Sequence, residues 1–408
     1  MNRRQFLVHS IAAASLGLSW KAWAIPSLPK TSAPRLLVVL LRGAYDSSSL
    51  LVPHGFPFYY TARPNIAIAK PDPTNPNAAL DIGQGYGLHP AVAPSLYTLF
   101  QARQATLVPF CGSQDLSRSH FQSQDVIELG QNPNDKGGLN YTSGFLNRLA
   151  AVLQQGGRNI SGMSFTANIT PIFKGDKEIP NINLQRQTNG TTDTRQIQML
   201  ESLYQGQRMS DYVREGIQTR QQVSAVLEKE MKDAPRGAAK ANGFEKEARS
   251  IAALMRDNPA YSIGFVDVGG WDTHVNQGAA TGTLATNLGN LGSGLSGFAE
   301  EMGAEAWRNT VVVVMSEFGR TFHENGNRGT DHGHASTMWI AGGGISGGKL
   351  AGEQTDLRQN TLFQNRDLPL LNDYRSVLSH VLSRMYGLNA AQLNTVFPGG
   401  SIKEYGIL

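Results

Sequence analysis

Runs of apolar residues along the chain predict the buried strands of an α/β protein. The first run, residues 35–41 (RLLVVLL), is uninterrupted, as expected for a central strand that is covered on both faces. Further short runs, rich in β-branched residues, are typical of strands with loops of glycine and polar residues between them. They predict strands at residues 106–111, 160–165, 262–268, 311–314 and 337–341.

Apolar residues at steps of three and four predict helices between these strands. The spacing indicates helices at residues 90–102, 144–153, 284–302 and 368–387. The helix at 284–302 holds four glycines, each of which costs about 1 kcal/mol relative to alanine. We expect close backbone packing on the sheet to offset that cost. Residues 191–258 show helical spacing with charged residues between the apolar ones, which favours a helical insertion whose role is packing.

The first 24 residues are typical of a twin-arginine signal peptide. Arg3 and Arg4 precede an apolar run at residues 11–18, and Ala22 and Ala24 provide an A-x-A cleavage site. The apolar run is too short for a permanent membrane anchor. We therefore expect the twin-arginine translocase to export the folded chain to the periplasm or outside, with residues 25–408 as a single domain.

The formal net charge falls from +4 to +1 once the signal is set aside. The chain has 36 basic and 32 acidic residues, and three of the basic ones, but none of the acids, lie in the signal. The remainder is close to neutral, so charge gives no case for nucleic-acid binding. Cys111 is the single cysteine, which excludes an intrachain disulfide and favours a small buried side chain.

Acids, histidines and a serine stand at the ends of the predicted strands. In open α/β sheets, ligands bind outside the carboxyl ends of the strands. A mixture of carboxylates and imidazoles suits zinc, manganese or iron better than calcium. Ser119 stands at a predicted helix start, where a hydroxyl is either a cap or a nucleophile. The set comprises Asp46, Ser119, Asp272, His274, Glu317, Asp331, His332 and His334.

Four segments carry a resemblance to a known family. They are LVVLLRGAYDSSSLLVPHG, SRSHFQSQD, FVDVGGWDTHVNQG and VMSEFGRTFHENGNRGTDHGHASTMWIAGGGISGG. With them the chain resembles an uncharacterised bacterial family of twin-arginine-exported proteins within the alkaline phosphatase-like superfamily, which includes sulfatases and phosphodiesterases. The resemblance implies a three-layer α/β/α fold with a mostly parallel sheet. It also implies a divalent metal, zinc or manganese, as one or two ions.

The resemblance assigns roles to single residues. Asp46 matches the acid after the first strand, which binds a metal, and Ser119 matches the nucleophile. Asp272 and His274 match a central pair of metal ligands, although members of the superfamily usually space this pair wider.

The late ligands can be matched in two ways. In one, Asp331 and His332 supply the acid and the histidine of an Asp-His-Gly signature. In the other, Glu317 replaces the acid at the strand end, and His332 or His334 is the last histidine. Both alternatives place this segment at the metal.

The implied activity is hydrolysis of a phosphate or sulfate ester, either a small molecule or a polymer. Arg118 and Arg320 are candidates for binding its anionic oxygens. The alternative is a non-catalytic exported protein that keeps the fold and binds a partner through its loops. The departures from the spacing of the superfamily motivate this second hypothesis.

Overall fold

A seven-stranded sheet forms the centre of the computed structural model, in the order β10-β5-β9-β8-β1-β7-β6. Strand β9 is antiparallel to β5 and β8, and the other pairs are parallel. This arrangement confirms the predicted fold class. The strands are β1 (Arg35–Leu41), β5 (Ala105–Gly112), β6 (Ser161–Ser164), β7 (Tyr261–Val268), β8 (Thr310–Ser316), β9 (Ser336–Ala341) and β10 (Asn372–Asp373).

The structure describes residues 33–158, 160–184, 194–207, 209–233, 243–258 and 260–408. The predicted signal peptide, residues 1–24, lies outside this part of the chain. Within it, no helix has the length and apolar character needed to cross a bilayer.

Strand β1 explains the unbroken apolar run at residues 35–41. It pairs in parallel with β7 on one side and with β8 on the other. Its side chains alternate between two cores, and all of them are buried. Leu37, Val39 and Leu41 face one core, whereas Leu36, Val38 and Leu40 face the other. A strand buried on both faces needs apolar residues at every position.

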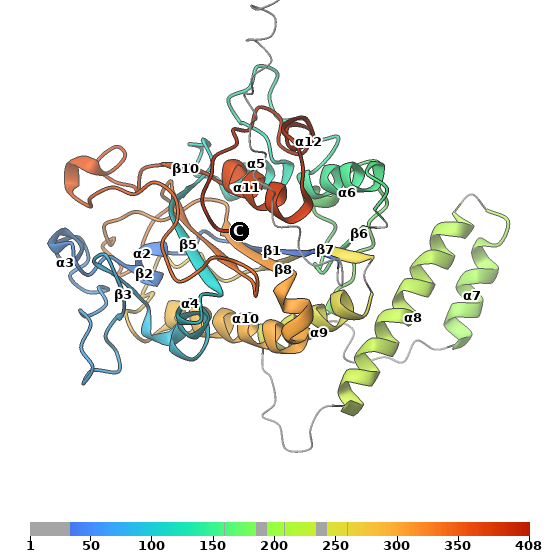
Figure 1. Ribbon diagram of the computed structural model, residues 1–408, viewed down its shortest axis with the longest axis horizontal. Coiled ribbons are helices and arrows are strands. Elements are labelled where there is room, and N and C mark those ends of the chain that lie inside the picture. Colours follow the sequence, from blue (N-terminus) through green and yellow to red (C-terminus); the bar gives the residue numbers. More distant parts are fainter. Residues whose placement is uncertain (1–32, 159, 185–193, 208, 234–242, 259) are drawn as a thin grey trace, which may run out of the picture. The chain divides into compact units, whose positions relative to one another are not determined.

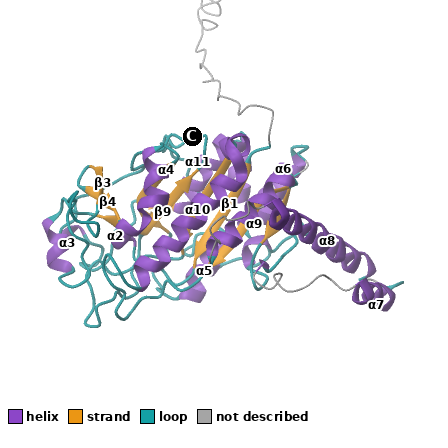
Figure 2. Ribbon diagram, turned by 90° about the horizontal axis from the view of Figure 1, so that it is seen from below, coloured by secondary structure: helices purple, strands orange, loops and turns teal. Residues whose placement is uncertain are grey.

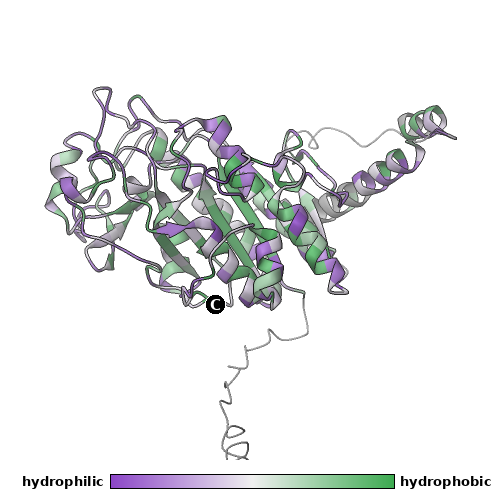
Figure 3. Ribbon diagram, turned by 90° about the horizontal axis from the view of Figure 1, so that it is seen from above, coloured by the Kyte–Doolittle hydropathy of each residue, from purple (hydrophilic) through white to green (hydrophobic). Residues whose placement is uncertain are grey.

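Helices cover both faces of the sheet and complete the three layers (Figures 1 and 2). One face packs against α4 (Thr98–Gln101), α9 (Phe244–Asp257) and α10 (Thr283–Arg308). The other packs against α5 (His120–Leu129), α6 (Phe145–Gln155), α11 (Tyr374–Tyr386) and α12 (Ala390–Val396). Figure 3 shows the strands between them as the most hydrophobic ribbon.

The remaining elements lie in the long connections. The described part of the predicted helical segment 191–258 contains α7 and α8 besides α9, and residues 53–90 contribute to a small three-stranded sheet, β2-β4-β3. These elements are α2 (Ser47–Leu50), β2 (Leu51–Val52), α3 (Pro57–Ala62), β3 (Leu80–Gly83), β4 (Tyr86–Leu88), α7 (Thr194–Tyr204) and α8 (Ser210–Asp233), with short 3-10 or π turns at Pro90–Val92, Ala93–Tyr97, Pro171–Phe173 and Gln359–Thr361.

Two predicted helices differ from those observed. The helix expected at 90–102 is divided into a 3-10 turn, a π turn and α4. The helix expected from 368 begins only at Tyr374, because Asp373 accepts a hydrogen bond from the amide of Arg375 and caps the first turn.

The antiparallel direction of β9 brings the loops with the candidate residues together at one edge of the sheet. The chain leaves β1, β5, β7 and β8 at one edge of the sheet, and it enters β9 at that same edge. The loops that follow the parallel strands therefore meet the loop that precedes β9.

The glycines of α10 allow close packing, but against helices rather than against the sheet as expected. A Cβ atom added to Gly294 would lie 2.4 Å from Cδ1 of Phe244 in α9. One added to Gly292 would lie 2.2 Å from the hydroxyl of Ser95. The close approach of α9 to α10 therefore requires a residue without a side chain.

We predict that Gly294→Ala destabilises the fold, because overpacking of a well-packed contact costs about 1–3 kcal/mol. Gly216→Ala in α8 is the matched control, since a Cβ there would meet nothing within 4 Å. We expect that change to raise the free energy of unfolding by about 1 kcal/mol. Urea denaturation measures both, and a Gly294→Ala protein at least as stable as the wild type would contradict the packing argument.

Candidate metal centre

Three histidines and one aspartate meet at this edge of the sheet. His120 begins α5, Asp272 and His274 follow β7, and His332 precedes β9. The Nε2 atoms of His274 and His332 lie 3.0 Å apart. Oδ1 of Asp272 lies 2.9 Å from Nε2 of His274 and 3.3 Å from Nε2 of His332, and its Oδ2 lies 3.5 Å from Nε2 of His120.

The second nitrogen of each ring is bound to an oxygen acceptor. The acceptors of the three Nδ1 atoms are Glu317 for His120 (2.8 Å), Asp331 for His274 (2.9 Å) and the carbonyl of Arg118 for His332 (2.9 Å). With Nδ1–H donating, each Nε2 directs a lone pair into the cluster. Lone pairs at 3.0 Å repel each other unless a proton or a cation lies between them.

The spacing of these atoms suits a divalent cation. A zinc–nitrogen bond of about 2.0–2.1 Å in tetrahedral geometry separates ligand atoms by about 3.3 Å. Four of the separations between these atoms run from 2.9 to 3.5 Å, and the ligand atoms of His120, Asp272 and His332 all lie within 4.8 Å of one another. Nε2 of His120 is buried and has no hydrogen-bond partner, as expected of a ligand atom. Acceptors on the opposite nitrogens complete the usual surroundings of a metal-binding histidine.

Glu317 and Asp331 both lie beside the cluster, each bound to a different histidine. Glu317 is fully buried, and burial alone would raise its pKa. Hydrogen bonds from His120, the amide of Gly43 and Gln124 outweigh this effect and lower the pKa. The bond to Glu317 in turn raises the pKa of His120. Glu317 and Asp331, the two alternatives for the acidic ligand, therefore both lie at the cluster, each as a hydrogen-bond acceptor of one imidazole.

The structure does not bring Asp46, expected as a metal ligand, into the cluster. Its carboxylate accepts bonds from both terminal nitrogens of buried Arg63, at 2.5 and 3.0 Å. Gln277 and Ser49 donate to the same carboxylate, each at 2.7 Å. Burial would raise the pKa of Asp46, but the charge and hydrogen bonds of Arg63 lower it. Both oxygens are thus taken by protein donors.

Gln277 connects this ion pair to the cluster. Its amide nitrogen donates to Asp46, and its amide oxygen accepts from the hydroxyls of Thr273 (3.3 Å) and Thr330 (3.0 Å). Thr273 lies between Asp272 and His274 in the sequence, and Thr330 lies two residues before His332. The ion pair and the loops that carry the histidines form one buried hydrogen-bonded network.

The two arginines expected to bind substrate are engaged by the protein. Arg320 is buried, and its guanidinium donates to the carboxylate of Asp272. It also donates to carbonyl oxygens of Gly43, Ala44, Trp271 and Thr330. Arg118 donates to Asp367 at 3.1 and 2.6 Å. These contacts do not support the expected role in substrate binding.

Arg118 contributes instead through its backbone. It adopts a φ of 51°, a left-handed conformation that costs energy for a residue with a side chain. Its carbonyl oxygen in this conformation is the acceptor for Nδ1 of His332.

Ser119 and His334 differ in their relation to the cluster. Ser119 precedes His120 at the N-cap position of α5, but its hydroxyl makes no capping hydrogen bond. His334 points elsewhere: its Nε2 lies 3.1 Å from the carbonyl of Ser113, and its ring lies against Phe363. Burial lowers the pKa of His334. The structure therefore brings His332, and not His334, to the cluster.

His120 is the cluster residue that sequence reasoning missed. It stands one position after Ser119, at a helix start beyond a predicted strand. The rule that selected His274, an imidazole just past a strand, applies equally to His120. At this helix start the sequence offers both the hydroxyl of Ser119 and the imidazole of His120, and only the hydroxyl was expected to contribute to the chemistry.

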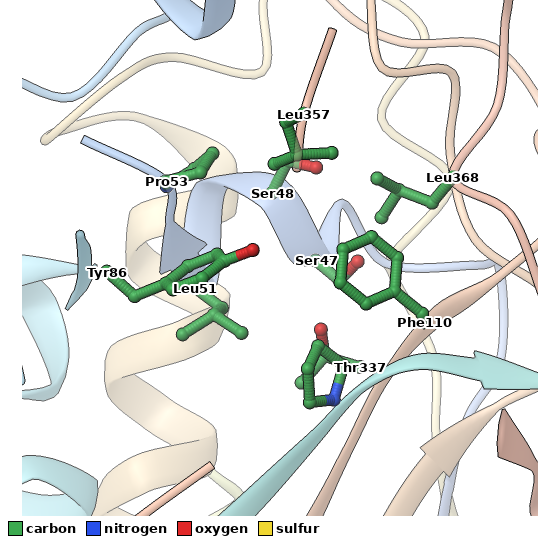
Figure 4. Close-up of a pocket in the computed structure, with 10 residues that line it drawn as sticks. Ser47, Ser48, Leu51, Pro53, Tyr86, Phe110, Thr337, Leu357 and Leu368 are labelled. Carbon is green, nitrogen blue, oxygen red and sulfur yellow. The ribbon is translucent and has the colours of Figure 1, made fainter. Parts of the chain in front are cut away.

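The cluster is open to the surface. The side chain of Asp272 is 46% exposed, and His274 and His332 are partly exposed. The cavity shown in Figure 4, between Ser47 and Thr337, holds about 10 Å³, room for at most one water molecule. It cannot admit an ester.

We predict that Arg63→Met lowers the free energy of unfolding by about 3–5 kcal/mol, because it leaves the carboxylate of Asp46 buried and unpaired. Denaturation near neutral pH measures the loss.

The wild-type contribution of the pair also depends on pH. Because folding lowers the pKa of Asp46, this contribution is present above the unfolded pKa of about 3.9 and is lost as pH falls through the folded one.

Arg358→Met is the control for this prediction. Arg358 pairs with Asp356 at 2.8 Å, but both side chains are exposed. We expect a change of about 1 kcal/mol or less, the range of surface pairs. Equal effects of the two substitutions would contradict the importance of the buried pair.

Comparison with solved structures gives remote similarities. They include Ps i-CgsB in complex with k-i-k-neocarrahexaose (9% identity, TM-score 0.44, covering 89% of this chain and 74% of that one). A protein in the alkaline phosphatase superfamily from Vibrio parahaemolyticus shows 10% identity and a TM-score of 0.35, with 84% and 69% covered. The phosphonate monoester hydrolase of Silicibacter pomeroyi shows 11% identity and a TM-score of 0.36, with 86% of this chain and 73% of that one covered.

No curated protein matches the sequence. A family model, in contrast, matches residues 33–397, a range that includes all four segments of the predicted resemblance. The chain belongs to the family described as protein of unknown function (DUF1501).

Proposed function

We propose that the protein is an exported, metal-dependent hydrolase of phosphate or sulfate esters. One divalent cation, zinc in first place, is bound by His120, Asp272, His274 and His332. The observation that carries the proposal is the convergence of three imidazole Nε2 atoms on one carboxylate, with each Nδ1 bound to an acceptor. Imidazole and carboxylate ligands with such acceptors suit zinc.

The surrounding residues support this site. Arg320 orients Asp272, while Glu317, Asp331 and the carbonyl of Arg118 fix the ring orientation of the three histidines. Preset ligands need little rearrangement when the cation binds. When bound, the cation polarises the ester and stabilises the charge that develops on its oxygens.

Ser119 is the proposed nucleophile. It adjoins His120 at the first turn of α5, where backbone N–H groups lack helical partners and favour anions. Its Oγ forms a bond to phosphorus or sulfur, its proton passes to solvent, and the leaving alcohol departs with the bonding electron pair and takes up a proton. Water then cleaves the seryl ester, which restores Ser119 and releases the phosphoryl or sulfuryl product.

Export is the remaining part of the proposal. Residues 1–24 support a twin-arginine route to the periplasm or the medium. Because this route carries folded proteins, the cation can be bound before transit.

We predict that wild-type protein isolated from the periplasm holds about one equivalent of zinc, as measured by elemental analysis. Loss of the hydrogen-bond partner of a ligand weakens metal binding by roughly 10–100-fold. His332→Ala removes a ligand itself, so it should weaken zinc binding by more than this. His334→Ala is the matched control, since its ring contacts Ser113 and Phe363 instead. Chelator competition measures both affinities. Unchanged binding in His332→Ala would refute the proposed centre.

A second prediction tests catalysis. We expect zinc-loaded protein to hydrolyse a generic 4-nitrophenyl phosphate or sulfate ester. Ser119→Ala should remove this turnover while the zinc content stays unchanged, because Ser119 is not a ligand. Turnover that survives the substitution would assign the attack to water. Zinc-loaded wild-type protein that turns over no ester would favour the alternative, a non-catalytic binding protein.

A further inference from the structure

The charges around the cluster limit the ester that it can accept. Three carboxylates, those of Asp272, Glu317 and Asp331, touch the histidines, and only Arg320 offsets them by direct contact. A neighbouring group, in which Arg118 and Arg366 share Asp367, adds one positive charge. Together these groups carry one negative charge, and a further group, in which Arg42 pairs with Glu128 and Asp267 and reaches Glu317 through Gln124, carries another. A bound divalent cation balances these two charges, so a singly charged anion leaves one negative charge in excess and a doubly charged anion leaves two.

A doubly charged anion finds no further cation. Among the residues that the structure describes, Arg320 is the one basic side chain paired with a ligand of the cluster, and its guanidinium is buried under four carbonyl oxygens. Arg118 is held by Asp367 and Gln364. A second negative charge would therefore remain unbalanced at a partly desolvated site, where charges interact more strongly than in water.

Three large apolar side chains close in sequence to residues of the cluster are exposed. Phe121, the residue after His120, is 85% exposed, so its ring adds little to the core. Leu116, in the loop that leads to α5, is 50% exposed, and Val275, directly after His274, is 58% exposed. Large exposed apolar side chains that adjoin a polar centre indicate a binding surface.

We propose, on the basis of the function proposed above, that this site selects esters with a single negative charge, phosphodiesters or sulfate monoesters, over doubly charged phosphate monoesters. Phe121 contacts the organic group of the ester and determines specificity for it. In the reaction, water is added across the P–O or S–O bond: its oxygen stays on phosphorus or sulfur, and the leaving alcohol gains a proton.

Inert anions test the charge preference without any turnover. Zinc-loaded protein is titrated by calorimetry at about pH 9, above the second pKa of a phosphoryl group, which is about 6 in phosphates. The probes are methyl phenylphosphonate and benzenesulfonate, each with one charge, and phenylphosphonate, with two. We expect one of the singly charged probes to bind at least about tenfold more tightly than phenylphosphonate.

The two singly charged probes identify the substrate class. Tighter binding of methyl phenylphosphonate assigns phosphodiesters, and tighter binding of benzenesulfonate assigns sulfate esters. Phenylphosphonate that binds as tightly as the tighter of the two singly charged probes overturns the inference, whether or not the protein hydrolyses esters. Conversely, absence of turnover of all 4-nitrophenyl esters overturns the proposed function even where the binding preference is found, so the two failures are distinguishable.

The role of Phe121 is tested with a ring-free probe. Phe121→Ala should weaken binding of methyl phenylphosphonate by about three- to tenfold, the usual range for one aromatic contact, and leave binding of methyl methylphosphonate unchanged. Leu203→Ala is the control, because Leu203 is also largely exposed, at 61%, and lies in α7, which packs against α8. Zinc content verifies that each variant keeps its centre. Equal losses for both probes, or no loss, would overturn the role of the ring.

Discussion

The guanidinium of Arg320 is the contact on which the arrangement of the centre depends. It lies in the interior and donates to the carboxylate of Asp272 and to carbonyls in the loops after β1 and β7 and before β9. A buried charge is stable only when it is paired and its donors are satisfied. These loops must therefore assemble around Arg320, and the same assembly brings Asp272, His274 and His332 within ligand distance of one another.

A second buried pair, Asp46 with Arg63, extends this constraint through the interior. Gln277 joins the pair to Thr273 and Thr330, which flank the residues of the cluster. Arg63 also donates to the carbonyls of Thr321 and Phe322, in the loop that follows Arg320. Each backbone segment around the centre is thus fixed by a side chain from a distant part of the chain. A preset polar network of this kind explains how four ligand atoms can lie so close together.

Sequence reasoning could identify the strands and the edge where they deliver polar residues, because buried parallel strands leave a strong local pattern at 35–41 and 262–268. It could not predict which buried charged side chains form ion pairs with each other. Asp46 and Arg63 are 17 residues apart, and Arg63 lies in an irregular connection without periodic pattern. Arg320 and Asp272 are 48 residues apart. An acid is therefore easily taken for a metal ligand, and an arginine for a substrate-binding residue, when its partner in the fold is another buried side chain.

The position of the acids shows why the choice between Glu317 and Asp331 had no single answer in the sequence. Neither contacts an Nε2 atom as Asp272 does, but each reaches the outer nitrogen of one imidazole. A carboxylate in that place fixes the tautomer and makes the ring a stronger ligand. In the proposed metal centre it also adds a negative charge for the cation to balance. Two such carboxylates would therefore strengthen the binding of the cation and, for the same electrostatic reason, weaken the attraction for a doubly charged anion.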